Sequence, residues 1–174
     1  NIGPAGMSGR VTAIDVDKKN NIIYIGTASG GVWASLNGGI SWKPIFDDQP
    51  TQSIGCIKVN QRNPDEIWVG TGEGNPRNSH NAGQGIFHSL DGGKTWACMG
   101  LKQSRLIHRI LIDADDPATV YAGVLGPAWG PGTERGVYKT RDGGKTWSRS
   151  LFVNDSTGVG EMVMDPTNPN KLIV

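Results

Sequence analysis

One short motif occurs three times in this chain and constrains its fold more than any other feature. The copies span residues 31–42, 85–96 and 136–147, and each ends with a tryptophan after an Asn/Asp-Gly-Gly-x-Ser/Thr turn. Each copy follows an Asp or Asn and a run of β-branched and aromatic residues, and the copies recur about every 50 residues. This repetition predicts a chain built from several similar supersecondary units.

Each unit is expected to contain four short strands. In the first unit they fall at about 11–16, 22–27, 31–36 and 41–45, where β-branched and aromatic residues dominate. Four strands in each repeat of this length indicate a β-propeller, an all-β fold of four-stranded antiparallel blades. We therefore predict one partial propeller over residues 1–174, with blade 1 at about 10–46, blade 2 at about 52–100, blade 3 at about 105–152 and the start of blade 4 at about 158–174.

Propellers close their ring with roughly 4–8 blades, and an open ring leaves unpaired strand edges. Three blades and the start of a fourth are therefore interpreted as a fragment of a larger propeller. We expect its partners to be the remaining blades of the same protein or other chains in a larger assembly.

Composition narrows the classes of function. The chain has 17 basic and 16 acidic residues, so no charge excess suits a nucleic-acid backbone. No apolar run is long enough for a membrane-spanning helix. No His/Cys cluster has metal-ligand spacing, and we predict no metal site and no cofactor. Asp47 and Asp48 could bind calcium, but two adjacent acids fit a solvated turn better.

The repeated turn has a structural explanation. Its Asp or Asn accepts hydrogen bonds from nearby N–H groups, its glycines supply positive φ, its Ser or Thr adds a side-chain hydrogen bond, and its tryptophan is buried beneath the turn. We assign this role to Ser35, Asn37, Trp42, Ser89, Asp91, Trp96, Thr140, Asp142 and Trp147.

Two loops between second and third strands are unusually long, and long loops are often functional. They span 72–84 and 126–135, and propeller geometry places both on one face, opposite the repeated turns. A tryptophan beside Glu and Arg on that face could bind a sugar or a peptide. The candidate ligand-binding residues are Glu73, Arg77, Asn78, His80, Trp129, Glu134 and Arg135. Alternatively, Arg77 and Arg135 anchor their own loops through carbonyls and carboxylates.

The innermost strands contain further polar positions. Aligning the repeats places Arg109 and Glu161 on neighbouring blades near the central channel, where they either pair or face a central site. Arg109 is therefore a further ligand-binding candidate. Cys56 and Cys98 fall on the innermost and outermost strands of blade 2, too far apart for a disulfide, so both are predicted to be free thiols.

The turns are similar to Asp boxes, or bacterial neuraminidase repeats, which occur in sialidases, xyloglucanases, sortilin-type receptors and a photosystem II assembly factor. Longer sequence segments resemble the N-terminal propeller of large secreted bacterial sortilin-like proteins, which are often labelled glycosyl hydrolases. These segments of the chain span residues 9–14, 24–33, 68–73, 77–79 and 134–140. The resemblance implies a non-catalytic binding or scaffold propeller for a protein or glycan ligand. It implies a secreted, periplasmic or cell-surface location in bacteria.

The alternative function is a glycoside hydrolase, sialidase- or xyloglucanase-like, whose catalytic set is completed by blades outside this chain. The xyloglucanase family has a catalytic Asp in a Thr-Asp-x-Gly-Gly pattern, and here Ala28 stands at that position. Sialidases use three arginines, and none of the arginines here lies in a sialidase-like phrase. No catalytic residue is therefore assigned. If the protein is an enzyme, Glu73, Glu134 and Glu161 are the candidates within this chain.

Overall fold

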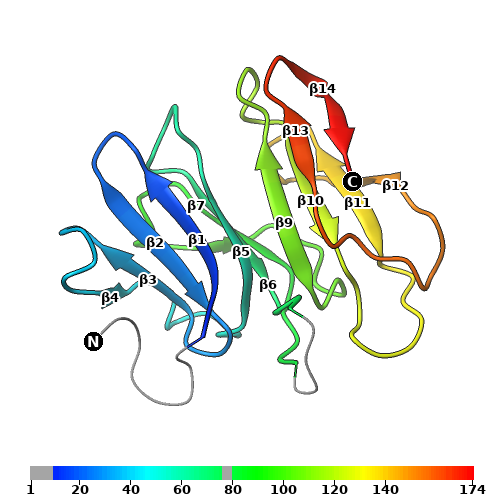
Figure 1. Cartoon of the computed structure of the whole chain (residues 1–174), viewed down its shortest axis with the longest axis horizontal. Helices are drawn as coiled ribbons and strands as arrows, with labels where there is room; N and C mark the ends of the chain where they lie inside the picture. The colour runs from blue at the N-terminus through cyan, green and yellow to red at the C-terminus, as the bar shows by residue number, and fades with distance from the viewer. Residues whose placement is uncertain (1–9, 76–79) are drawn as a thin grey trace.

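The structure is a computed structural model and describes residues 10–75 and 80–174. These residues form only β-strands, turns and irregular segments, with no helix among them (Figure 1). Blade 1 contains β1 (Val11–Asp17), β2 (Ile22–Thr27), β3 (Val32–Ser35) and β4 (Lys43–Pro44); blade 2 contains β5 (Ile54–Val59), β6 (Ile67–Thr71), β7 (Ile86–Ser89) and β8 (Ala97–Cys98); blade 3 contains β9 (Ile107–Ile112), β10 (Val120–Val124), β11 (Gly136–Thr140) and β12 (Ser148–Leu151); β13 (Val163–Asp165) and β14 (Asn168–Ile173) form a two-stranded sheet.

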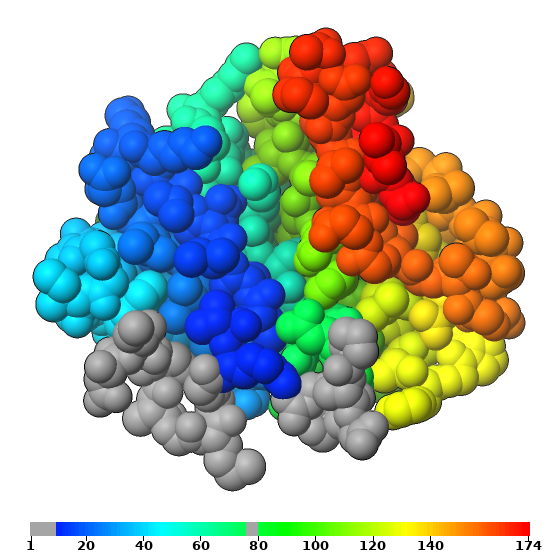
Figure 2. Space-filling model, viewed as in Figure 1, coloured from blue at the N-terminus to red at the C-terminus, as the bar shows by residue number. Residues whose placement is uncertain are grey.

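Each of the first three sheets is an antiparallel meander whose strands lie side by side in chain order. The innermost strands β1, β5 and β9 contact one another in turn, so the sheets are arranged around a common centre. In Figure 2 the inner strands of blades 2 and 3 lie recessed between the blue and the red sheets. The short turns after each innermost strand lie at the top of Figure 1, and the long loops lie at the bottom.

The outermost strands are shorter than expected. The fourth strand of blade 1 was predicted at about 41–45, whereas β4 contains only Lys43 and Pro44. One further hydrogen bond follows Pro44, from the Ile45 N–H to the carbonyl oxygen of Val32 at 2.9 Å. The outermost strand of blade 2 is equally short and is exposed. In blades 1 and 2 the innermost strand is therefore the longest and the outermost strand is the shortest.

The hydrophobic core lies between the blades. One cluster joins blade 1 to blade 2, and in it the ring of Phe46 packs edge-on against Phe87 and Trp96, with centroids 5.3 and 5.0 Å apart. A second cluster joins blade 2 to blade 3 around Trp68, whose side chain is fully buried. Each cluster contains residues from two blades, so a single blade could not bury its own apolar face.

The three repeated turns share most of one hydrogen-bond pattern, which supports the structural role proposed for them. In blade 2, Oδ1 of Asp91 accepts from the N–H of Lys94 and Thr95 at 3.0 and 2.9 Å, and Oδ2 accepts from the Thr95 hydroxyl at 2.6 Å. The hydroxyl of Ser89 accepts from the Gly93 N–H at 2.8 Å. Blade 3 repeats the contacts to the Thr hydroxyl and to the second glycine through Asp142 and Thr140. Blade 1 repeats the backbone contacts through Ser35 and Asn37, but there Nδ2 of Asn37 donates to the Ser41 hydroxyl.

The tryptophans of these turns also join neighbouring blades, which the sequence did not reveal. Nε1 of Trp96 donates to the carbonyl oxygen of Ile45 in blade 1, and Nε1 of Trp147 donates to that of Met99 in blade 2, both at 2.7 Å. Each acceptor lies three residues after the tryptophan of its own blade. Nε1 of Trp42 is buried and has no acceptor among residues 10–75 and 80–174.

The turn carboxylates make the fold sensitive to acid. Hydrogen bonds from Thr95 and Thr146 lower the pKa of Asp91 and Asp142 from 3.8 to about 2. A carboxyl group with a lowered folded-state pKa stabilises the fold above its unfolded pKa, and this contribution is lost as the pH falls through the folded pKa. We predict that the urea midpoint decreases between about pH 4 and about pH 2.

The matched variant replaces both Asp91 and Asp142 with Asn, the residue that blade 1 already has at position 37. The double variant should fold and should lose less stability than the wild type over the same pH interval. Urea titrations followed by tryptophan fluorescence at each pH provide the measurement. Equal losses in the two proteins would contradict the assignment.

Candidate functional site

A cleft of about 670 Å³ opens on the face that carries the long loops. It lies between the β6–β7 loop, the β8–β9 link and the β10–β11 loop, as propeller geometry predicts for these connections. Its lining combines apolar and polar side chains; it contains His80, Ala82, Gln103, Arg105, Leu106, Pro127, Ala128, Trp129, Pro131, Gly132, Thr133 and Glu134. Concave sites with an apolar lining and a few polar groups are typical of ligand sites.

Three of the predicted residues meet in this cleft. Trp129 is 71% exposed, so its indole ring is largely available to a ligand. Glu134 lines the cleft and accepts a hydrogen bond from the Tyr138 hydroxyl at 3.2 Å. His80 also lines it, and Nδ1 of its ring lies 3.0 Å from the carbonyl oxygen of Glu73. The predicted candidates Arg77 and Asn78 lie outside the described residues.

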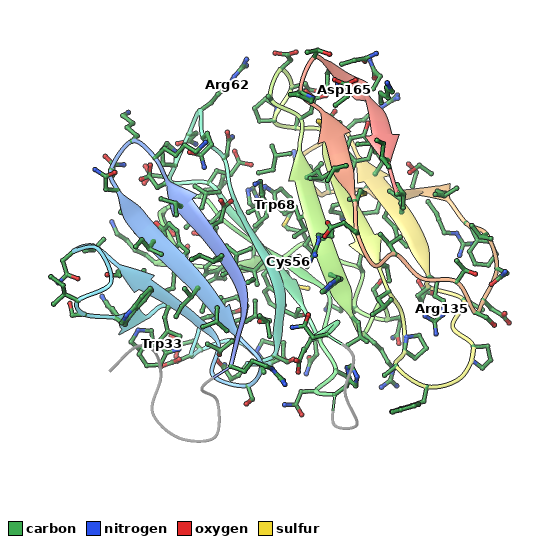
Figure 3. The ribbon with its side chains drawn as sticks, in the orientation of Figure 1. Trp33, Cys56, Arg62, Trp68, Arg135 and Asp165 are labelled. Carbon is green, nitrogen blue, oxygen red and sulfur yellow. The ribbon has the colours of Figure 1, made fainter. Side chains whose placement is uncertain are left out.

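Arg135 anchors the β10–β11 loop, as the alternative interpretation proposed. Its buried guanidinium donates to the carbonyl oxygens of Leu125, Pro127, Gly130 and Asp155 (Figure 3). Because these carbonyls use its donors within the protein, its position does not support the assignment as a ligand-binding residue. Its function is to hold the loop that carries Trp129 and Glu134 in one conformation.

The β6–β7 loop is held against the next blade by close backbone contacts. Gly72 has a φ of +89°, and the N–H of Gly83 donates to the carbonyl oxygen of Arg105 at 2.6 Å. The Thr71 hydroxyl accepts from the N–H of Gln84 at 2.8 Å. Arg105, which the sequence analysis did not select for this site, is exposed at the cleft. The β8–β9 link thus supplies both a cleft residue and an anchor for the neighbouring loop.

Glu73 is buried beneath the loops and does not line the cleft. It is 1% exposed, and its carboxylate pairs with Arg10, whose Nη2 lies 2.5 Å from Oε2. The Glu73 N–H donates to the Ser53 hydroxyl at 3.1 Å. The positive charge of Arg10 offsets the free-energy cost of burying the Glu73 carboxylate. Glu73 therefore joins blade 1 to blade 2, and its assignment to ligand binding is not supported by its position.

Arg109 and Glu161 form the expected ion pair between blade 3 and the last sheet. Nη2 of Arg109 donates to Oε2 of Glu161 at 2.6 Å, and Nη1 donates to the carbonyl oxygen of His108 at 2.8 Å. Hydrogen bonding to Arg109 lowers the pKa of Glu161 to about 2. Burial and the nearby Arg109 lower the pKa of His108. Arg109 thus pairs with Glu161 and does not line the cleft.

The remaining sequence predictions concern thiols, metals and membranes. Cys56 and Cys98 are free thiols, as predicted, and burial raises the pKa of Cys56 to about 12. Within the described ranges, no group of three or more His, Cys, Asp or Glu is placed to hold a metal ion. The same part of the chain contains no helix that is long and apolar enough to cross a membrane.

The sheets and turns define the class of protein: the chain consists of blades of an Asp-box β-propeller. The model of the BNR/Asp-box repeat family matches residues 138–149, the repeat in blade 3. The other two turns have the same hydrogen bonds, so the structure extends this assignment to all three blades.

Within this class, the chain is similar to xyloglucanases. A xyloglucanase of Paenibacillus sp is 25% identical over 89% of this chain and 17% of its own length. The crystal structure of a GH74 enzyme from Niastella koreensis has a TM-score of 0.70 at 24% identity and covers 92% of this chain. That of an ancestral GH74 enzyme has a TM-score of 0.65 at 26% identity and covers 89%. The chain spans 24% and 20% of those two structures.

Proposed function

We propose that these blades bind a polysaccharide in the cleft beside Trp129, as part of a larger glycoside-hydrolase-type propeller. The exposed Trp129 carries the proposal, because a flat apolar ring with a polar edge suits the C–H face of a sugar. Glu134 at the same cleft can accept hydrogen bonds from sugar hydroxyls. Similarity to xyloglucanases over about nine-tenths of the chain supports a glucan of the xyloglucan kind as the ligand.

The residues of this chain contribute binding rather than a complete catalytic pair. Glycoside hydrolysis uses two carboxylates about 5 to 9.5 Å apart. Glu134 is the single acidic residue among the described residues that line the cleft. Ala28, at the position of the xyloglucanase catalytic Asp, is buried. Cleavage by the whole protein would therefore need carboxylates from other parts of the propeller.

This proposal reverses the ranking of the two functions that the sequence suggested. The sequence favoured a non-catalytic scaffold, whereas the relatives support the glycoside-hydrolase alternative better. The scaffold function, the sortilin-like relationship and the secreted location stay predictions. A polymeric glycan does not enter a cell, so the proposed ligand is consistent with a location outside the cytoplasm.

Binding of xyloglucan oligosaccharides tests the proposal. We predict that Trp129→Ala weakens binding at least about tenfold, since aromatic anchors in binding sites contribute about 2 kcal/mol or more. Isothermal titration of the intact protein with a xyloglucan heptasaccharide and with mannohexaose measures affinity and preference. Phe152→Ala is the matched control, because Phe152 is a partly exposed aromatic residue outside the cleft. Equal affinity for the two sugars would refute xyloglucan as the ligand, and no effect of Trp129→Ala would refute glycan recognition in this cleft.

A further inference from the structure

A second concave surface lies between blades 1 and 2, with a volume of about 700 Å³. We call it the blade 1–2 groove; its apolar lining includes Ile22, Ala34, Leu36, Ile45 and Trp96, and its charged lining includes Asp17, Asp47, Asp48, Asp65, Asp91, Lys43 and Lys94. It contains the Asp-box turn of blade 2, and it shares no lining residue with the cleft at Trp129. The proposed glycan site therefore does not account for it.

Blade 1 differs from the other two blades in a side chain that lines the groove. One aromatic residue on each second strand faces a partner on the third strand: Tyr24 faces Ala34, Trp68 faces His88, and Tyr121 faces Lys139. His88 stacks on Trp68 with centroids 3.9 Å apart, and Nζ of Lys139 lies 4.7 Å from the Tyr121 ring centroid. Blades 2 and 3 thus have a basic side chain at this position, whereas blade 1 has Ala34, which is 9% exposed and lines the groove.

The charge around the groove also lacks compensation. Five aspartates and two lysines line it, so its net charge is negative. Asp47, Asp48 and Asp65 are exposed, and none of them takes part in an ion pair among residues 10–75 and 80–174. Burial, followed by the charges of Asp17 and Asp65, raises the pKa of Tyr24. The electrostatic potential of this surface therefore favours a cation.

We propose that the blade 1–2 groove binds a basic segment of a partner polypeptide, with a lysine or arginine side chain over Ala34. The aliphatic part of such a side chain can cover apolar surface while its charged end stays near carboxylates. Tyr24 is only 2% exposed, so the guest contacts Ala34, Leu36 and Ile45 rather than the face of that ring. The charged end of the guest lies near the exposed carboxylates of Asp47, Asp48 and Asp65.

Fluorescence anisotropy of a labelled peptide of alternating leucine and lysine tests the proposal on the intact protein. We expect the peptide to bind, an otherwise identical leucine–glutamate peptide not to bind, and the affinity to decrease as salt increases. Ala34→Lys introduces the blade 3 side chain into blade 1 and should weaken peptide binding at least about tenfold, the factor that corresponds to 1.4 kcal/mol.

A second variant keeps the test valid if Ala34→Lys disturbs folding. Asp47→Asn with Asp48→Asn preserves the shape of the groove and should weaken the binding and its salt dependence. Asp115→Asn with Asp116→Asn is the matched control, because these adjacent acids lie in blade 3 outside the groove. Equal binding of the two peptides, or an affinity unchanged by Ala34→Lys and by the Asp47/Asp48 variant, would overturn the proposal. If spermine displaces the labelled peptide at an equal concentration, a small polycation suffices for binding and the proposal of a polypeptide partner is overturned.

Discussion

Replacing Gly72 with alanine should destabilise the protein by about 2–5 kcal/mol and abolish glycan binding at the cleft. Gly72 has a φ of +89°, where a side chain is strained. A Cβ atom there would lie 1.8 Å from the carbonyl oxygen of Arg105 and 2.8 Å from the nitrogen of Gly83. Both neighbours are backbone atoms, so a rotamer change cannot relieve the contact. The β6–β7 loop and the β8–β9 link would have to separate.

The matched control for this prediction is Gly143→Ala. Gly143 also has a positive φ, +67°, but no atom lies within 4 Å of a Cβ built there. Its cost should be the backbone strain alone, about 1–2 kcal/mol, with glycan binding intact. Urea unfolding and isothermal titration of both variants provide the comparison. Equal destabilisation by the two substitutions would show that the contact with Arg105 contributes little.

Truncation of Trp68 to alanine should lower the free energy of unfolding by about 3–5 kcal/mol, the usual range for a buried tryptophan. The indole is fully buried, stacks on His88 and meets the edge of Trp147 at a centroid distance of 6.3 Å. Nε1 donates to Oε1 of Glu66 at 3.0 Å. Burial alone would raise the pKa of Glu66, but hydrogen bonds from His88, Asn60 and Trp68 lower it overall. Truncation would therefore remove packing and one carboxylate partner together.

Two variants separate these contributions. Trp68→Phe keeps most of the ring but removes the hydrogen bond, and it should recover a large part of the lost stability. Trp129→Ala removes an exposed indole of the same size and should change the free energy of unfolding by less than about 0.5 kcal/mol. Urea titrations followed by far-ultraviolet circular dichroism measure all three proteins. If Trp68→Ala lowers the free energy of unfolding as little as Trp129→Ala does, the Trp68 side chain does not pack between blades 2 and 3 as described.

Local features made much of this structure predictable. The Asp-box turns are stabilised by hydrogen bonds within a few residues, so their geometry follows from the motif itself. The rule that alternate loops share a face also placed His80, Trp129 and Glu134 together before the cleft was seen.

Repeat alignment predicted the pairing of Arg109 with Glu161, but other features that depend on two blades could not be predicted. The pairing of Arg10 with Glu73 joins residues from different blades, and no sequence pattern indicates it. The groove at Ala34 is equally hidden, because it depends on the partner across the strand and on the neighbouring blade's turn. For Arg135, the sequence supported both ligand binding and loop anchoring, and only the positions of four carbonyl oxygens decide between them.

The tryptophan hydrogen bonds that join the blades have an evolutionary consequence. A single repeat carries both halves of the joint, an indole that donates to the blade before it and a carbonyl that accepts from the blade after it. A tandem gene duplication of one repeat would therefore copy a complete connector with it. The number of blades in such proteins can change in one genetic event, while loops on the opposite face diverge toward new ligands.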